Sequence, residues 1–94
     1  MTQAARHGKG QFKIDLAGAF IRRTDLSNAN LEGADLSRAD CANAIFRGAN
    51  MKDAVLDGTV LKGADLTGAR NLTKAQIARA IVDERTILPS DLAD

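Results

Sequence analysis

Aspartate residues recur along this chain at multiples of five residues, and carboxylates are common in acid–base catalysis and in metal binding. The series is Asp15, Asp25, Asp35, Asp40 and Asp65. Catalysis would require several of these carboxylates to converge on one point. Whether they converge depends on the structure that carries them, so the periodic pattern has to be interpreted first.

The other reactive side chains indicate no catalytic or metal site. His7, the sole histidine, has no cysteine or carboxylate at the spacing of a metal site. Gly-Lys-Gly at 8–10 is not a phosphate-binding loop, because no strand precedes it and no helix follows. Cys41, the sole cysteine, excludes an intrachain disulfide and is expected to be a buried apolar side chain. We therefore predict no enzyme activity, no catalytic residue, no metal ligand and no cofactor.

Length and charge exclude several classes of protein. The 94 residues make one small domain, and the formal net charge is +1. Residues 1–14 carry +3, whereas 15–70 and 71–94 each carry −1, so no region suits a nucleic-acid surface. No apolar run is long enough to cross a membrane, and the N-terminus lacks the apolar core of a secretory signal. We expect a cytoplasmic protein, either complete or part of a longer chain.

The aspartates belong to a pattern whose period of five residues fits neither an α-helix nor a β-strand. From 16 to 66, every fifth residue is apolar, and the residue two positions before it is usually Ala. The apolar series is Leu16, Ile21, Leu26, Leu31, Leu36, Cys41, Phe46, Met51, Leu56, Leu61 and Leu66. Every glycine after residue 10 falls two positions after a member of this series, and Gly and Asn tolerate tight turns. The pattern predicts short extended sides with two inward residues each, joined at sharp corners into stacked coils.

These units resemble the A(D/N)LXX unit of pentapeptide repeat proteins, as Ala-Asn-Leu-Glu-Gly at 29–33 and Ala-Asp-Leu-Thr-Gly at 64–68 illustrate. The resemblance covers residues 14–70. It implies an all-β fold, a right-handed quadrilateral β-helix with about 20 residues per coil. The repeat region then makes just under three coils. The predicted organisation is an N-terminal arm or cap at 1–13, the repeat β-helix at 14–70, and a C-terminal helix and tail cap at 71–94.

Both ends of such a stack need covers. At the C-terminal end, Thr73 and Gln76 form a capping box, which predicts a short helix from Lys74 to about Ile81. An extended piece at 86–88 follows. We interpret this tail as a lid over the last coil, and it is also a candidate surface for a homodimer. At the other end, Phe12 is a candidate plug over the first coil.

Four apolar residues occupy the outward phase, immediately before the central apolar residue, in which Asp or Asn is usual. They are Phe20, Ile45, Val55 and Val60. The chain's own tail could cover Val55 and Val60 through Ile87 and Leu88; a second copy or a partner could contact them; or their exposure is incidental. All six residues are predicted protein contacts. The aspartates share this outward phase, so they line different faces and are expected to be a solvated surface.

The sequence therefore favours a non-enzymatic scaffold or protein-interaction module whose partner is a protein of unknown identity. A homodimer through the C-terminal cap is possible, whereas nucleic acid and membrane are not expected partners. The resemblance implies an alternative, a DNA-mimic type protein that binds a type II topoisomerase. The short stack and near-neutral charge disfavour it. A third possibility is a repeat domain of a larger assembly. A bacterial, cytoplasmic protein is expected.

Overall fold

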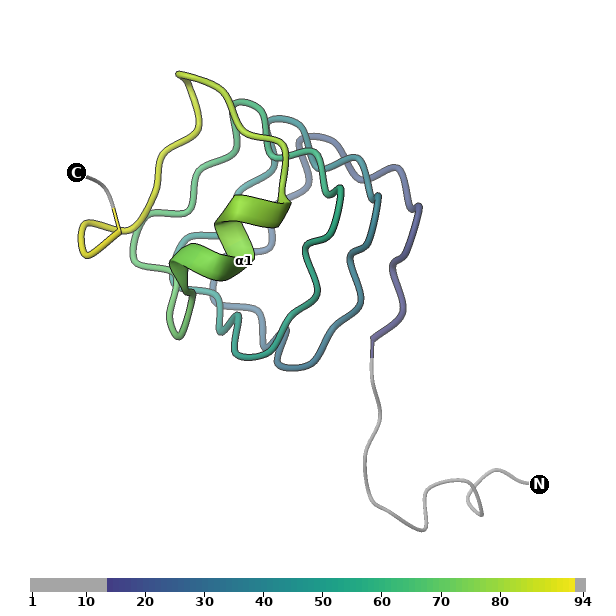
Figure 1. Ribbon diagram of the computed structural model, residues 1–94, viewed down its shortest axis with the longest axis horizontal. Helices are drawn as coiled ribbons and strands as arrows, with labels where there is room; N and C mark the ends of the chain where they lie inside the picture. Colours follow the sequence, from purple (N-terminus) through teal and green to yellow (C-terminus); the bar gives the residue numbers. More distant parts are fainter. Residues whose placement is uncertain (1–13, 93–94) are drawn as a thin grey trace, which may run out of the picture.

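The repeat region is a stack of coils in which residues twenty apart lie side by side. The computed structural model describes residues 14–92. Within them, eight parallel β-bridges join residues i and i+20, beginning with Asp15 and Asp35 and ending with Asn50 and Arg70. Four such bridges occur per coil, one on each side. Figure 1 shows the coils following one another from the N-terminal end, in purple, toward the tail, in yellow.

We name the four faces of the stack by their bridged residues, in chain order. Face 1 carries Asp15, Asp35 and Val55, and face 2 carries Phe20, Asp40, Val60 and Ile81. Face 3 carries Asp25, Ile45, Asp65 and Ile87, and face 4 carries Asn30, Asn50 and Arg70. Each face is therefore a ladder of single residues rather than of extended strands.

Each side is short because a turn follows every bridged residue. The N–H of Ala19 donates to the carbonyl of Leu16 at 3.0 Å, and the same contact recurs in each side from that of Ala29 with Leu26 to that of Ala69 with Leu66. The third residue of each turn has a positive φ. Main-chain bonds between coils, such as Leu16 N–H to Asp35 O at 2.8 Å, use the remaining groups. The expected β-helical coil is therefore made of isolated bridges, and the only helix in residues 14–92 is α1.

The corners lie at the predicted positions, two residues after each inward apolar residue. Some of them are occupied by residues other than Gly and Asn. Arg23, Arg38 and Asp53 also adopt a positive φ of 57–59° there. Gly48 is needed for a second reason, since a Cβ at this position would collide with the side-chain oxygen of Asn28 one coil earlier. Gly48, and Gly63 beside Asn43 in the same way, thus serve the approach of successive coils as well as the turn.

The inward residues form one apolar core. It comprises Leu31, Ala34, Leu36, Ala39, Cys41, Ala44, Phe46, Ala49, Met51, Ala54, Leu56, Leu61, Ala64, Leu66, Ala69 and Leu72. The buried Phe46 occupies the same column as Leu26 and Leu66. Thr59 takes the place of an inward alanine and is fully buried, and its hydroxyl donates to the carbonyl of Leu36 at 2.6 Å. This bond removes the penalty of burying a lone hydroxyl.

The C-terminal helix α1 spans Lys74–Arg79 and begins with the predicted capping box. Thr73 accepts a hydrogen bond from the Gln76 N–H, and the Gln76 side chain accepts one from the Thr73 N–H at 2.8 Å. The helix ends two residues earlier than predicted. Ile81, which the prediction included in the helix, lies beyond its end and forms a bridge with Val60.

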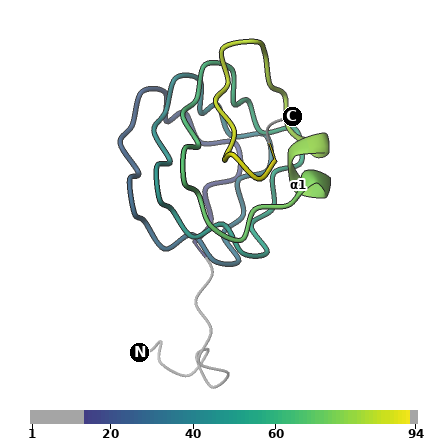
Figure 2. The ribbon, with the colours of Figure 1, turned by 90° about the vertical axis from the view of Figure 1, so that its left-hand side faces the viewer.

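The tail after α1 extends the stack on two faces. Ile81 bridges Val60 on face 2, and Ile87 bridges Asp65 on face 3. Figure 2 looks toward this end and shows the tail crossing in front of the coils. Of the three alternatives for Val55 and Val60, the tail does lie beside Val60, but through Ile81 rather than through Ile87 or Leu88. Ile81 follows Val60 by 21 residues and Ile87 follows Asp65 by 22, rather than by 20, so the tail departs from the repeat's register.

Residues 1–13 lie outside the described part of the chain, and so does the proposed Phe12 plug. No helix in residues 14–92 has the length and apolar character needed to cross a membrane.

Candidate functional site

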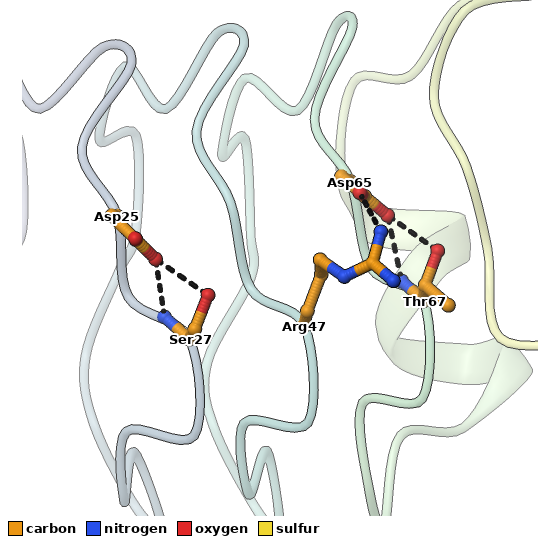
Figure 3. Close-up of polar contacts among 5 residues, drawn as sticks. All are labelled: Asp25, Ser27, Arg47, Asp65 and Thr67. Atoms are coloured by element: carbon orange, nitrogen blue, oxygen red, sulfur yellow. Dashed lines mark hydrogen bonds and ion pairs between the residues drawn. The ribbon is translucent and has the colours of Figure 1, made fainter.

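The recurrent aspartates do not converge, because each one caps the turn of its own side. The Asp25 carboxylate accepts hydrogen bonds from the N–H of Ser27 at 2.9 Å and from its hydroxyl at 2.5 Å (Figure 3). Asp15, Asp35, Asp40 and Asp65 accept from the N–H two residues later in the same way. The outward direction was predicted, whereas this structural role was missed. An Asx turn at Asp-x-Ser and Asp-x-Thr is the signal that could have found it.

Two of these carboxylates lie on face 3 and have lowered pKa values. The hydroxyl of Ser27, followed by its N–H, holds the pKa of Asp25 below the ordinary value of 3.8. For Asp65, the Thr67 hydroxyl is the main cause of the lowered pKa, and the Thr67 N–H and the Arg47 guanidinium add to it against the opposing effect of burial. Arg47 lies 2.9 Å from the Asp65 carboxylate, as Figure 3 shows. Both carboxylates therefore remain ionised and hydrogen-bonded at neutral pH, a state that suits a scaffold rather than a proton donor.

Cys41 is fully buried, as predicted. Burial, followed by the nearby negative charge of Asp40, raises the pKa of its thiol to about 12. Such a thiol is not a nucleophile at neutral pH. In residues 14–92, no three His, Cys, Asp or Glu side chains are placed to hold a metal ion together.

The six predicted contact residues are spread over three faces and differ in exposure. Phe20 on face 2 is 72% exposed, the largest value among the exposed large apolar residues described. Val55 on face 1 and Ile87 on face 3 are also exposed, whereas Ile45 and Val60 are half-buried. Leu88 is half-buried and packs against the core. The structure brings Phe20 and Val60 into one column and does not gather the six into one patch.

On face 2, Arg22 contacts both Phe20 and Asp40, the residue that lies between Phe20 and Val60 in the column. The Arg22 guanidinium lies 5.1 Å from the centre of the Phe20 ring and forms an ion pair of 2.9 Å with Asp40, the residue between the two apolar side chains. Arg22 thereby orients the ring and neutralises the carboxylate within the column. This arrangement was not predicted, although Arg22 follows Phe20 by only two residues and lies in the turn of the same side.

The cap contacts the end of the second coil and the third coil through polar side chains that replace main-chain partners. The Gln76 amide donates to the carbonyls of Met51 and Ala54 at 2.8 and 2.9 Å. The Asp83 carboxylate accepts the N–H of Gly63 at 3.0 Å, and the Thr86 hydroxyl donates to the carbonyl of Leu61 at 2.8 Å. These are structural contacts.

An open hollow of about 590 Å³ lies beside α1, lined by Lys52, Asp53, Asn71, Thr73 and Gln76 among others. The Gln76 amide on its wall is already bonded to two carbonyls, and the Asn71 amide donates to Asn50 at 2.8 Å. The hollow therefore offers no unpaired buried polar group to a ligand.

Comparison with known families identifies the repeat. A model of the family described as pentapeptide repeats matches residues 13–40 and 34–70, with eight copies. No curated protein matches the chain.

Solved structures of pentapeptide repeat proteins resemble the fold. Rfr23 from the cyanobacterium Cyanothece 51142 has a TM-score of 0.65 and 30% identity over 79% of this chain and 53% of that one. The protein alr5209 from Nostoc Pcc 7120 has a TM-score of 0.37 and 25% identity over 96% and 84%. A thylakoid lumen protein of Arabidopsis thaliana, AT2G44920, has a TM-score of 0.32 and 28% identity over 65% and 52%. The chain thus spans about half the length of the first and third. The similarity to Rfr23, together with the family match, implies the right-handed β-helix fold.

Proposed function

Because the chain belongs to the pentapeptide repeat family, we propose that it is a non-enzymatic protein-interaction module. Members of this family are generally non-enzymatic repeat proteins. The observation that carries the proposal is the column on face 2, where Phe20 is 72% exposed and its neighbours Ala19 and Ile21 are hydrogen-bonded to Asp40 of the next coil. A solvent-exposed aromatic ring in contact with an ion-paired arginine is the type of group that contributes strongly to binding at protein interfaces.

A protein partner fits the charge of the faces better than the mimicry of nucleic acid does. Arg22 pairs with Asp40 on face 2, and Arg47 pairs with Asp65 on face 3, so the aspartate ladders are interrupted by cations. A mimic of the phosphate backbone requires uncompensated negative charge along its surface. We therefore do not propose binding to a topoisomerase.

The proposed location is the cytoplasm, where a reduced Cys41 thiol persists.

The test is the purification of bound proteins with the intact chain, followed by reconstitution of each complex from purified components. The comparison variant carries Phe20→Asp, Val55→Asp and Val60→Asp, which restore the usual outward residue of the repeat. We expect at least one complex that the triple variant loses. Complexes that all survive in the variant would show that the outward apolar residues are not the contact. Failure to reconstitute any complex would contradict the interaction module itself.

A homodimer through the cap is a second arrangement that we propose to test. Ile81, Val82 and Ile87 remain 40–51% exposed at this end of the stack. The molar mass in solution distinguishes a monomer from an end-to-end dimer. A dimer that persists after Val82→Asp would place the contact elsewhere.

A further inference from the structure

We propose that face 2 is a docking surface for an amphipathic, acidic segment of a partner protein. This inference rests on the proposed interaction function and adds to it the surface and the chemistry of the partner.

The apolar part of the surface is a column that runs along the whole height of face 2. Three of its four bridged residues are apolar: Phe20, Val60 and Ile81. Phe20 and Ile81 are 72% and 44% exposed. The fourth, Asp40, is paired with Arg22, whose guanidinium lies over the Phe20 ring. A partner placed on this column therefore meets apolar groups and an already neutralised carboxylate.

No other face carries a comparable column. Face 4 has no apolar bridged residue, and face 1 has Val55 alone. On face 3, Ile45 and Ile87 alternate with Asp25 and Asp65. The Asp65 carboxylate is held by Arg47, and the Asp25 carboxylate is exposed at the end of the ladder. Face 2 is thus the face on which apolar side chains are least interrupted by charge.

Cations that lack an ionic partner flank this column. Arg23 and Lys62 lie along the border with face 3, and Arg38 lies at the corner with face 1. All three are exposed, and none forms an ion pair within residues 14–92. Of the acidic groups on the same sides, Asp40 pairs with Arg22 and Asp83 accepts main-chain N–H groups, whereas Glu84, between Ile81 and Ile87, is exposed. The cations thus outnumber the exposed carboxylates along this column. The complement of this surface is an apolar row bordered by carboxylates.

The spacing of the column suits a helix that lies along it. Adjacent coils are about 4.8 Å apart, so Phe20 and Val60, two coils apart, are separated by about 10 Å along the stack. Residues i and i+7 on one side of an α-helix are separated by about 10.5 Å. A helix can therefore place two apolar side chains on Phe20 and Val60 and direct acidic residues on its edges toward Arg23, Arg38 and Lys62.

A protein segment is favoured over an anionic membrane or a nucleic acid. The three unpaired cations at the borders of face 2 are too few to neutralise a row of phosphates. The exposed apolar groups form a narrow column, which matches the width of one polypeptide segment. Membrane and nucleic acid remain measurable outcomes of the test.

The test is the selection of a random library of 16-residue displayed peptides against the full chain. We expect enriched peptides that combine apolar residues with Asp and Glu, and that bind the purified chain. Their affinity should fall at least about tenfold with Phe20→Asp. The replacement should leave the fold intact, because aspartate at this phase caps the turn in neighbouring sides.

A pair of matched lysine variants isolates the charge. Lys62 on face 2 and Lys52 on face 4 are exposed at the same position of their turns. Lys62→Glu should weaken the selected peptides about three- to tenfold, whereas Lys52→Glu should leave their affinity unchanged. Thermal unfolding of all variants checks that each one is folded.

Several outcomes would overturn the inference, and they separate it from the proposed function. Enriched peptides without acidic bias, or peptides equally sensitive to Lys52→Glu and Lys62→Glu, would reject face 2 while leaving an interaction module in place. Failure to enrich any peptide would reject the peptide-binding surface, and the reconstitution experiment would then decide the function alone. Binding to phosphatidylserine vesicles or to single-stranded DNA that Phe20→Asp abolishes would reassign the surface. Self-association that Phe20→Asp abolishes would identify a second copy as the occupant.

Discussion

The two ends of the coil stack expose the same kind of main-chain edge, and within residues 14–92 only the C-terminal edge is covered. There, the N–H groups of Leu61 and Leu66 donate to the carbonyls of Ile81 and Ile87 at 2.7 Å, and the Gly58 N–H donates to Arg79 O at 2.9 Å. On faces 2 and 3 and at Gly58, the tail therefore supplies bonds that a further coil would make.

The first coil has no equivalent partner in the described part of the chain. The main-chain N–H and C=O groups of its bridged residues, Asp15, Phe20, Asp25 and Asn30, make no main-chain bond within residues 14–92. Its inward residues Leu16, Ile21 and Leu26 are only partly buried, whereas the inward leucines of the third coil are buried. The same repeat thus has different packing at its two ends.

The difference teaches that covering an edge requires chemistry that the repeat itself does not contain. The cap uses the Gln76 amide, the Asp83 carboxylate and the Thr86 hydroxyl where a coil would use main-chain groups. Side chains can do this because they donate or accept without the constraint of a twenty-residue register. Substitutions at the two ends can measure how much each end contributes to the free energy of unfolding.

Leucine truncation should separate the ends most clearly. Leu26 and Leu66 occupy one column, in the first and third coils. Leu66→Ala should lower the free energy of unfolding by about 3–5 kcal/mol, because Leu66 is fully buried. Leu26→Ala should cost only about 1–2 kcal/mol, because a partly exposed side chain leaves no closed cavity. Denaturant unfolding of both variants measures this, and equal costs would show that the first coil is as well packed as the third.

Gln76 should matter more for its amide than for its capping box. Gln76→Glu keeps an acceptor for the Thr73 N–H and removes the donor to the carbonyls of Met51 and Ala54. We expect a loss of about 1–3 kcal/mol in the free energy of unfolding. Thr73→Ala, which removes the cap hydroxyl alone, is the control and should cost about 1 kcal/mol. If both variants lose the same amount, the cap is not held to the coil through this amide.

Acid should weaken the cap more than the first coil. Burial alone would raise the pKa of Asp83, but the N–H groups of Gly63 and Arg85, the Thr86 hydroxyl and the Arg85 charge together lower it. A lowered pKa stabilises the fold above the ordinary value of 3.8, and this stability is lost as the pH falls through the lower folded value.

The unfolding temperature should therefore drop between pH 6 and pH 3. The drop should be smaller in Asp83→Asn, whose amide oxygen still accepts hydrogen bonds but does not titrate. Asp25→Asn on the first coil serves as the comparison and should reduce the drop less, because only Ser27 donates to Asp25. The reverse order would show that the first coil is the more acid-sensitive end.

The repeat region was predictable because one structural requirement recurs every five residues. Inward Leu36 and Phe46 and the corner at Gly33 each follow from the period alone. The tail was not predictable to the same extent, since Ile81 and Ile87 join the stack at separations of 21 and 22 residues from their partners. These separations depend on the three-dimensional path of α1 and of the tail that follows it.

The candidate site was only partly predictable, for a related reason. Phe20 and Val60 were identified because they break the outward pattern. The sequence could not show that Arg22 would pair with Asp40 in the next coil, because the contact spans 18 residues and depends on side-chain direction. The corner residues Arg23 and Arg38 were missed because a positive φ is uncommon for such side chains and is imposed here by the coils on either side.

The bridges between residues i and i+20 restrict how a protein of this kind can change length over evolution. Duplication of a twenty-residue segment adds one coil and returns the chain to the same face, so the cap meets an unchanged surface. Insertion of five, ten or fifteen residues would instead rotate the cap by one, two or three faces, and Gln76 and Asp83 would then meet different carbonyls and amides. Viable relatives with this cap should therefore differ in length by whole coils.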